Sequence, residues 1–421
     1  MSATRHRRGA ESGPLDDGTS PEAGGTPPPW VFCGTRRLRI PQAQRFEPPA
    51  RLTPAEDPDW TLSCALASPL GAPPLGELAA AALRGTPTRR VVIAVPDGSR
   101  ACPTPLIVEH VLADLATAGV PDESVTVVVG CGLHAPTGDP GRRALVGARV
   151  ADRVEVVDAQ AEEGPFARLG VTARGVPAVV HERVAHAALV VAVGVVEPHL
   201  YAGFSGGVKA VSIGCAGEAT IAATHDPRAI SAPGVTLGRL DGNPFQESLR
   251  EIAALTPLRF AVNAVVDEEG RPTAVVAGDP VRAQASLARA HRAAWLRAAD
   301  RPADVVVAGV PAPKSASLYQ ASRAFTYLAL QERPVLAEGG TVVLCADLSR
   351  GAGDGPAERN FAALLAGAAP HELVARGLRE PLGPGGQRAF VVARALQRFR
   401  LAVVGAALTG ERAPADPARP G

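Results

Sequence analysis

The sequence has almost no excess of charge. Its 43 Lys and Arg residues nearly balance its 42 Asp and Glu residues, and the formal net charge is +1 at pH 7. A surface that binds nucleic acid or an anionic membrane carries a marked excess of cations. We therefore expect no nucleic-acid partner and no membrane partner for this chain.

Long apolar runs and paired cysteines are also missing. The longest apolar run, Ala187–Val196, is too short to cross a bilayer, which takes about 20 residues. Residues 1–30 contain arginines but no apolar segment of the kind found in secretory signals. The six cysteines form no C-x-x-C pair, which favours small buried side chains over disulfides or zinc ligands. These absences predict a soluble, cytoplasmic protein.

The sequence does contain Val-, Ala- and Ile-rich runs that alternate with amphipathic segments. The runs at Val91–Val95, Val125–Val129 and Leu189–Val196 are nearly continuous rather than alternating, which is typical of strands buried on both faces of a parallel sheet. The segment Pro105–Gly119 is an amphipathic helix that closes on glycine. A second series of strands and helices begins near residue 300. The fold class predicted is α/β.

These patterns divide the chain into two domains and two tails. Residues 1–30 are rich in Pro, Gly and charge and are expected to be disordered, as is the tail at 409–421. Residues 31–296 form a larger N-terminal α/β domain with a mainly parallel sheet. Residues 297–408 form a smaller, Rossmann-like βαβ domain.

Polar clusters follow several of the predicted strands. In open α/β sheets, ligands bind outside the carboxyl ends of the strands. We therefore expect the active site to lie between the two domains, where the polar residues at four strand ends converge: Asp97, Arg100, His134, His199, Tyr319 and Gln320.

The stretch Val195–Ala210, VVEPHLYAGFSGGVKA, leaves several chemistries open. Its G-x-S-x-G motif places Ser205 as the nucleophile of a serine hydrolase, with Asp347 and His371 following in triad order. Against this, EPHLYA separates the strand from the turn. A Walker A phosphate loop fits less well, because Val208 separates the glycines from Lys209.

Three of the nine histidines stand apart from the rest. His134, His199 and His225 each lie in a loop rich in Gly, Pro or Thr after an apolar run. Together with an arginine and a lysine they indicate acid/base or metal chemistry. The sequence has no H-x-x-x-H pair, so a zinc site built from this chain alone is poorly supported. One histidine could still hold a metal whose other ligands belong to a cofactor.

The same motifs resemble the nickel-dependent lactate racemase family over roughly residues 35 to 405. The resemblance is carried by D-x-x-R at Asp97, G-x-H at Gly132, EPH at Glu197, GFSGGVK at Gly203 and YQ at Tyr319. In that family the lysine of the SGG-x-K motif carries a covalently tethered nickel-pincer nucleotide, a pyridinium-3,5-bisthiocarboxylic acid mononucleotide. The resemblance therefore implies an isomerase that racemises or epimerises a 2-hydroxy acid, lactate or a larger one, by reversible hydride transfer to this cofactor.

The resemblance also assigns roles to individual residues. It implies that His134 and His199 are the acid/base pair and that His225 is the nickel ligand. Arg100 would be a catalytic residue that partners either the substrate carboxylate or a catalytic histidine, with Asp97 as its supporting carboxylate. Lys209 would anchor the cofactor beside Ser205, Gly206 and Gly207, and we interpret the glycines as room for its close approach. Tyr319, Gln320 and Arg323 would bind substrate.

Arg323 departs from the lysine usual in the family at that position, which favours a different or larger acid. Further expected partners are proteins that make the cofactor or insert nickel. A relative that binds the cofactor without catalysis remains an alternative, as does the serine hydrolase.

Overall fold

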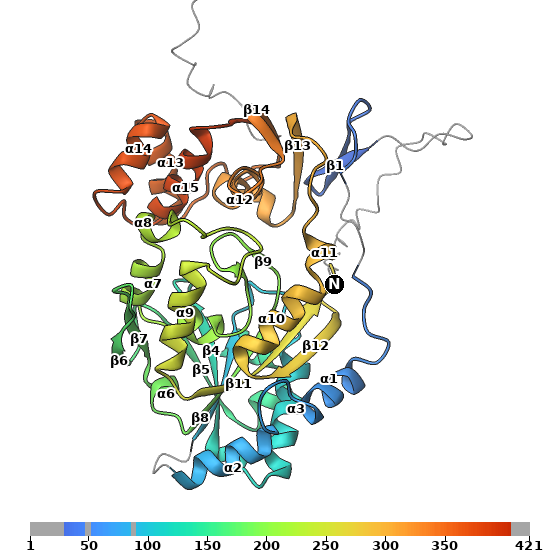
Figure 1. Ribbon diagram of the computed structural model, residues 1–421, viewed down its shortest axis with the longest axis vertical. Coiled ribbons are helices and arrows are strands. Elements are labelled where there is room, and N and C mark those ends of the chain that lie inside the picture. Colours follow the sequence, from blue (N-terminus) through green and yellow to red (C-terminus); the bar gives the residue numbers. More distant parts are fainter. Residues whose placement is uncertain (1–28, 47–51, 86–89, 406–421) are drawn as a thin grey trace, which may run out of the picture.

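The computed structural model describes residues 29–46, 52–85 and 90–405. The expected tails, 1–30 and 409–421, lie outside these ranges except for Pro29 and Trp30. Two sheets organise the rest of the chain, each in its own unit, and Figure 1 shows the orange and red C-terminal unit above the N-terminal one.

The N-terminal unit is built on a six-stranded sheet. Its strands are, in spatial order, β12 (Pro272–Gly278), β11 (Leu258–Val266), β8 (Leu189–Val195), β3 (Val91–Pro96), β4 (Val125–Gly132) and β5 (Glu155–Gln160). All neighbours are parallel except β11 and β12. The central strands β3, β4 and β8 are buried almost throughout, because their β-branched runs pack against helices on both faces. The predicted α/β class is confirmed.

Short helices and hairpins surround this sheet. The helices are α1 (Pro58–Ala67), α2 (Leu75–Gly85), α3 (Thr104–Thr117), α4 (Gly138–Val146), α5 (Ala148–Ala151), α6 (Glu182–Ala185), α7 (Glu218–Thr224), α8 (Pro227–Ile230), α9 (Pro244–Ala254), α10 (Pro280–Ala290) and α11 (Arg292–Trp295). The hairpins pair β6 (Phe166–Val171) with β7 (Pro177–His181), and β9 (Pro198–His199) with β10 (Gly203–Phe204). None of the described helices is both long enough and apolar enough to cross a membrane.

The C-terminal unit contains a five-stranded sheet. Its strands are, in spatial order, β15 (Arg400–Val404), β14 (Leu336–Cys345), β13 (Ala303–Pro311), β1 (Trp30–Gly34) and β2 (Arg36–Arg39). Its helices are α12 (Leu318–Ala329), α13 (Pro356–Gly367), α14 (Pro370–Gly377) and α15 (Gly386–Leu396). The strands run parallel except for the β1–β2 pair.

The position of the first hairpin corrects the sequence interpretation. Residues from 31 onward were expected in the N-terminal domain, but β1 pairs with β13 of the C-terminal sheet. This pairing satisfies the backbone groups of an edge that β13 would otherwise leave open. We propose that the boundary between the units lies near residue 296, between α11 and β13, as the sequence suggested.

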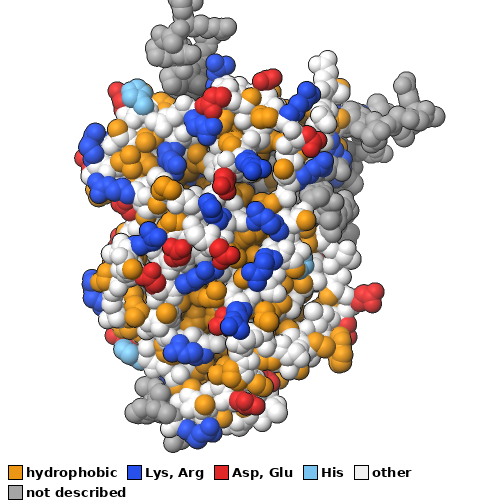
Figure 2. All heavy atoms as spheres, viewed as in Figure 1, with side chains coloured by type: hydrophobic (Ala, Val, Ile, Leu, Met, Phe, Trp, Pro, Cys, Tyr) orange, Lys and Arg blue, Asp and Glu red, His pale blue; other side chains and the backbone are white. Residues whose placement is uncertain are grey.

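The two units share one core and several polar contacts. Tyr201 and Phe245 of the first unit belong to the same buried cluster as Phe325 and Phe390 of the second. On the face drawn in Figure 2, Lys and Arg side chains lie across the middle of the molecule, with Asp and Glu side chains among them. At the boundary itself, Nε of Arg228 donates to the carbonyl oxygen of Leu378 at 2.8 Å.

Candidate active site

The turn after β3 places a carboxylate and a guanidinium at the carboxyl edge of the sheet. The Asp97 carboxylate accepts hydrogen bonds from the backbone N–H and the hydroxyl of Ser99, at 3.3 and 2.6 Å. Nη1 of Arg100 lies 2.7 Å from Oε1 of Glu197, which follows β8. This ion pair joins the ends of two neighbouring strands, as the sequence predicted for polar residues at this edge.

His134, in the loop after β4, is held by Asp97. Its Nδ1 lies 2.7 Å from Oδ2 of Asp97, so Nδ1 carries the proton and the lone pair of Nε2 is free. Burial alone would raise the pKa of Asp97, but the hydrogen bonds from His134 and Ser99 outweigh it and hold the pKa below its usual value. The carboxylate therefore stays ionised at neutral pH and fixes the tautomer of His134.

His199 is held in the opposite tautomer. Its Nδ1 accepts hydrogen bonds from the backbone N–H groups of Tyr201 and Ala202, at 3.3 and 3.2 Å. The proton of the neutral ring therefore lies on Nε2. Burial, followed by the positive charges of Lys209 and Arg100, holds the pKa of His199 well below 6.5. His199 is thus a neutral hydrogen-bond donor at physiological pH.

Lys209 lies close to this group, half-buried at the start of a π-helical turn over Ala210–Gly214. Desolvation and the nearby Arg100 guanidinium lower the pKa of Lys209 to about 7, with Glu197 opposing them. Nζ has no hydrogen-bond or ion-pair partner among the described residues. A lysine that is partly neutral at pH 7 and has no partner is a competent nucleophile.

The glycines before Lys209 are required by packing against the protein itself, which is a reason for glycine separate from the predicted room for a cofactor. A Cβ at Gly203 would meet the carbonyl oxygen of Arg239 at 1.8 Å, and one at Gly206 would meet Oδ1 of Asn263 at 2.8 Å. Gly207 donates its N–H to the same Asn263 oxygen at 2.8 Å. The loop therefore lies directly on the sheet, and any contact of Ser205, Gly206 and Gly207 with a cofactor remains a proposal.

The serine hydrolase alternative is wrong. Ser205 is buried, and its hydroxyl donates to the carbonyl oxygen of Val195 at 2.8 Å. Asp347 accepts hydrogen bonds from Ser315 and Ser349 instead of from a histidine. His371 is exposed on α14. The three residues make no triad, because each is engaged or placed elsewhere in the fold.

His225 ends helix α7 and fits the role of a metal ligand. Its Nδ1 lies 3.1 Å from the carbonyl oxygen of Ile221, which places the ring proton there and frees Nε2. Burial, followed by the charge of Lys209, lowers the pKa of His225 to about 4, so the ring is neutral. No group of three or more His, Cys, Asp or Glu side chains suited to a metal occurs in the described part of the chain.

The residues expected from the second domain are only partly brought to this site. Arg323, on α12, is near enough to His199 to lower its pKa. Tyr319 packs edge-on against Phe361 within its own unit, with ring centroids 5.4 Å apart. Gln320 is half-buried beside it, and its backbone N–H bonds to the hydroxyl of Ser317.

Sequence reasoning missed two residues of α15. Gln387 donates a hydrogen bond from its side-chain amide to the hydroxyl of Tyr201. Arg388 is 8% exposed, on a helix whose other buried side chains are apolar. The segment GQRAFVVARAL places two arginines, Arg388 and Arg394, among apolar residues, and this was the available signal, because an arginine is rarely fully buried without a partner.

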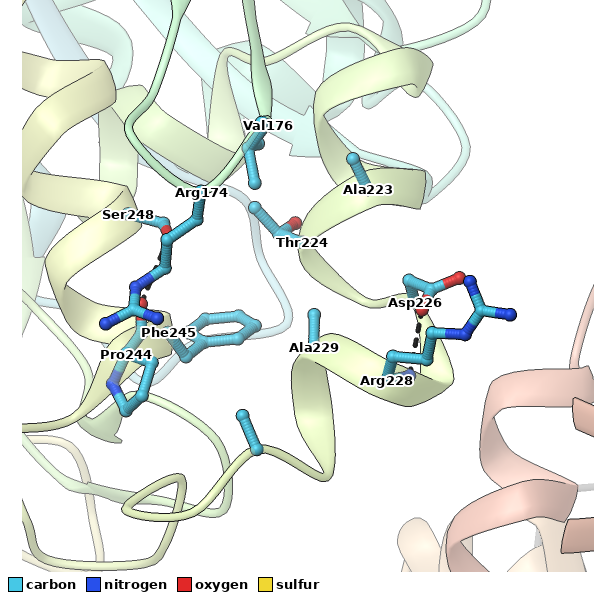
Figure 3. A pocket seen from close by; sticks show the side chains of 12 residues that line it. Arg174, Val176, Ala223, Thr224, Asp226, Arg228, Ala229, Pro244, Phe245 and Ser248 are labelled. Carbon is cyan, nitrogen blue, oxygen red and sulfur yellow. Dashed lines mark hydrogen bonds between the residues drawn. The ribbon is translucent and has the colours of Figure 1, made fainter. Parts of the chain in front are cut away.

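A pocket of about 460 Å³ adjoins the His225 side of the site. Figure 3 shows its lining side chains, which come from α7, α8, α9 and the turn at Arg174. Thr224 and Phe245, which line it, both contact His225: the Thr224 hydroxyl at 3.0 Å from Nδ1, and the Phe245 ring at 5.2 Å between centroids. His134, His199 and Lys209 do not line this pocket.

Fold and site together define a two-unit α/β protein with a histidine- and lysine-containing site at the carboxyl edge of its larger sheet. A family model described as "Lactate racemase N-terminal domain" matches residues 34–238. The lactate racemase of Lactiplantibacillus plantarum is 27% identical over 317 residues, which cover 72% of this chain and 68% of that protein. The lactate racemase of Thermoanaerobacterium thermosaccharolyticum is 26% identical over 297 residues, covering 69% and 66%. The chain belongs to the lactate racemase family.

Solved structures support the fold. The lactate racemase apoprotein from T. thermosaccharolyticum superposes with a TM-score of 0.77 at 21% identity, covering 89% of this chain and 88% of that one. A protein from Thermotoga maritima superposes with a TM-score of 0.59 at 18% identity, covering 80% and 89%. The arrangement of both units is therefore that of known folded proteins.

Proposed function

We propose that this protein racemises or epimerises a 2-hydroxy acid by reversible hydride transfer, with a nickel-pincer nucleotide tethered to Lys209. The observation that carries the proposal is the set of hydrogen bonds that leaves His134, His199 and His225 in defined tautomers around a lysine of lowered pKa. Family membership adds independent support.

His134 accepts the hydroxyl proton of the substrate in this proposal. The lone pair of Nε2 is available, and the Asp97 carboxylate stabilises the imidazolium that forms. The hydrogen at C2 is a poor proton, because the adjacent carboxylate is already anionic, so it leaves more readily as hydride. The planar keto acid rotates so that its opposite face meets the hydride. Proton and hydride are then both returned to it, so the substrate undergoes no net oxidation.

His199 presents a proton on Nε2 to the same substrate. Its pKa well below 6.5 keeps it neutral, so it supplies a hydrogen bond to the substrate oxygen without adding a positive charge. Arg100 binds the substrate carboxylate: Glu197 holds one of its terminal nitrogens and leaves the rest of the fork available.

Two residues suit the cofactor. The partly neutral amine of Lys209 can form the amide-type link, and Nε2 of His225 can ligate nickel. When bound, the cofactor would supply the hydride acceptor, which no protein side chain provides.

The composition of the chain makes a sharp test possible. The sequence has only two lysines, Lys209 and the exposed Lys314. Protein from a strain that supplies the cofactor genes would be studied by intact mass, peptide mapping and metal analysis. We expect a nucleotide-sized adduct on Lys209 alone, nickel near one equivalent, and exchange of configuration at C2 of a 2-hydroxy acid.

Other outcomes would separate the alternatives. An unmodified Lys209 without nickel, despite available cofactor, would refute the proposal. An adduct without exchange for any 2-hydroxy acid would identify a protein that carries the cofactor without catalysis. Lys209→Arg is the matched variant, because it keeps the positive charge but cannot form the link.

A further inference from the structure

Two arginines of the C-terminal unit, one buried and one half-buried, have guanidinium nitrogens that are buried without a partner among the described residues. Arg388 on α15 is 8% exposed, and its Nε and Nη1 have no hydrogen-bond partner among the described residues. Arg323 on α12 is half-buried, but its Nε is buried and likewise has no hydrogen-bond partner there. Neither forms an ion pair with a carboxylate in the described part of the chain.

Such an arrangement is costly for the protein alone. Burying a guanidinium without a partner loses its hydration, and two neighbouring ones also repel each other. Burial, followed by the charge of Arg388, lowers the pKa of Arg323. Buried cations are normally paired, so the pair is best explained by an anionic ligand that both arginines bind.

The position of the pair places this anion at the candidate active site. Arg388 follows Gln387, which contacts Tyr201, and the Tyr201 ring lies 5.9 Å from His199 and 5.8 Å from His225 between centroids. Arg323 lies on α12, whose Phe325 packs in the same buried cluster as Tyr201. In agreement with these positions, the charge of Arg323 helps to lower the pKa of His199, and the charge of Arg388 helps to lower the pKa of His225. The hydrogen bond between Gln387 and Tyr201 fixes the start of α15 against the loop that carries His199. The two arginines therefore line the C-terminal side of the site that Arg100 lines from the N-terminal side.

We propose that Arg323 and Arg388 form a subsite for a second carboxylate, so that the substrate is a short 2-hydroxy dicarboxylate. This inference rests on the proposed function, because it takes Arg100 as the partner of the carboxylate next to the reacting carbon. The reacting carbon then lies between two guanidinium sites, one in each unit. Arginine suits the distal site, because its planar fork binds carboxylate oxygens in a bidentate manner.

A phosphate group shares this chemistry, and the cofactor carries one. The binding experiment therefore uses the full-length protein without cofactor and compares separate probes by calorimetry. The probes are lactate, 2-hydroxysuccinate, 2-hydroxyglutarate, inorganic phosphate and nicotinic acid mononucleotide. We expect a 2-hydroxy dicarboxylate to bind at least about ten-fold more tightly than lactate, because it gains charge-assisted hydrogen bonds.

Substitution of Arg388 tests the subsite directly. Arg388→Met keeps most of the side-chain volume and should abolish the preference for the dicarboxylate over lactate. Because it removes a buried unpaired charge, it should also raise the melting temperature of the protein without ligand. Arg398→Met is the matched control, since Arg398 is exposed and paired with Glu338 at 2.8 Å. Arg323→Lys gives a second variant that retains the charge but loses the fork.

The outcomes separate this inference from the proposed function. Equal affinity for lactate and both dicarboxylates, or a preference that survives in Arg388→Met, would overturn the subsite. Loss of phosphate or mononucleotide binding in Arg388→Met, with no effect on dicarboxylates, would assign the arginines to the cofactor and also overturn it. Because this binding is measured without cofactor, a missing adduct on Lys209 would refute the proposed function while leaving the dicarboxylate affinity as a separate result.

Discussion

The hydroxyl of Tyr201, in the N-terminal unit, accepts a hydrogen bond from the side-chain amide of Gln387, in the C-terminal unit. The same tyrosine ring lies between two histidines of the site, with centroids 5.9 Å from His199 and 5.8 Å from His225. Burial raises the pKa of Tyr201, so the hydroxyl stays protonated and polar. The contact therefore sets the position of α15 relative to both histidines.

Removal of the hydrogen bond between Tyr201 and Gln387 should weaken the packing of the two units against each other. In a double-mutant cycle of Tyr201→Phe and Gln387→Ala, we expect a coupling of about 1 kcal/mol in the free energy of unfolding. Denaturant unfolding measures it. Tyr327→Phe, on α12, is the control, and a coupling indistinguishable from zero would show that the hydrogen bond does not stabilise the interface.

Asp97→Asn should impair catalysis far more than folding. The amide cannot hold the proton of His134 on Nδ1 as a carboxylate does, so kcat should fall by about 10²–10⁴-fold. Ser99→Ala removes one hydrogen bond to Asp97 and should cost much less. Racemisation by cofactor-loaded protein is the measurement, and equal losses in the two variants would contradict the role of Asp97.

Lys209 should react as an amine near neutral pH. With a pKa of about 7, its neutral fraction rises from a minority at pH 6 to a large majority at pH 8. Exposed lysines are almost fully protonated in this range, so Lys314 serves as the internal reference. Acetylation by acetic anhydride, followed by mass spectrometry, should label Lys209 first. A Lys209 rate that does not level off by pH 8 would contradict the lowered pKa.

His199 and His225 should keep their neutral tautomers across pH 6.5–8. Nitrogen-15 NMR of labelled protein without cofactor should find the proton on Nδ1 in His225 and on Nε2 in His199. The signal of His199 should not shift as the pH falls to 6, because its pKa lies well below 6.5. A titration of His199 within this range would overturn its role as a neutral donor.

Gly206→Ala should destabilise the protein more than Gly175→Ala. Both glycines have positive φ, 79° and 80°, so both substitutions incur the same backbone strain of about 1 kcal/mol. Only at Gly206 would the new Cβ also meet protein atoms, because nothing lies within 4 Å of one at Gly175. Denaturant unfolding of the two variants isolates the packing of the loop that carries Lys209.

The central sheet could be predicted because the residue pattern within each strand is enough to identify it. Uninterrupted β-branched runs such as Val91–Val95 have few alternatives to a strand buried on both faces. The pairing of β1 with β13 could not be predicted, since it joins segments some 270 residues apart and leaves no local signal. Long-range strand pairing depends on which edge is open in the folded protein.

The site was predictable to the extent that its residues follow strand ends. Asp97 and His134 lie after neighbouring parallel strands, and the topology alone brings them together. Arg388 and Gln387 come from a helix, where side-chain direction depends on how α15 packs against the other unit. The packing role of the glycines near Lys209 could not be predicted, because a sequence does not indicate whether a glycine faces a ligand or the protein itself.

The first hairpin of the chain belongs to the far sheet, and this has a mechanical consequence. The polypeptide passes between the units twice, once after β2 and again after α11. A unit attached at two places has less freedom to rotate than one attached at a single place. Because Arg323 and Arg388 both belong to the C-terminal unit, any displacement of that unit would move them together relative to Lys209.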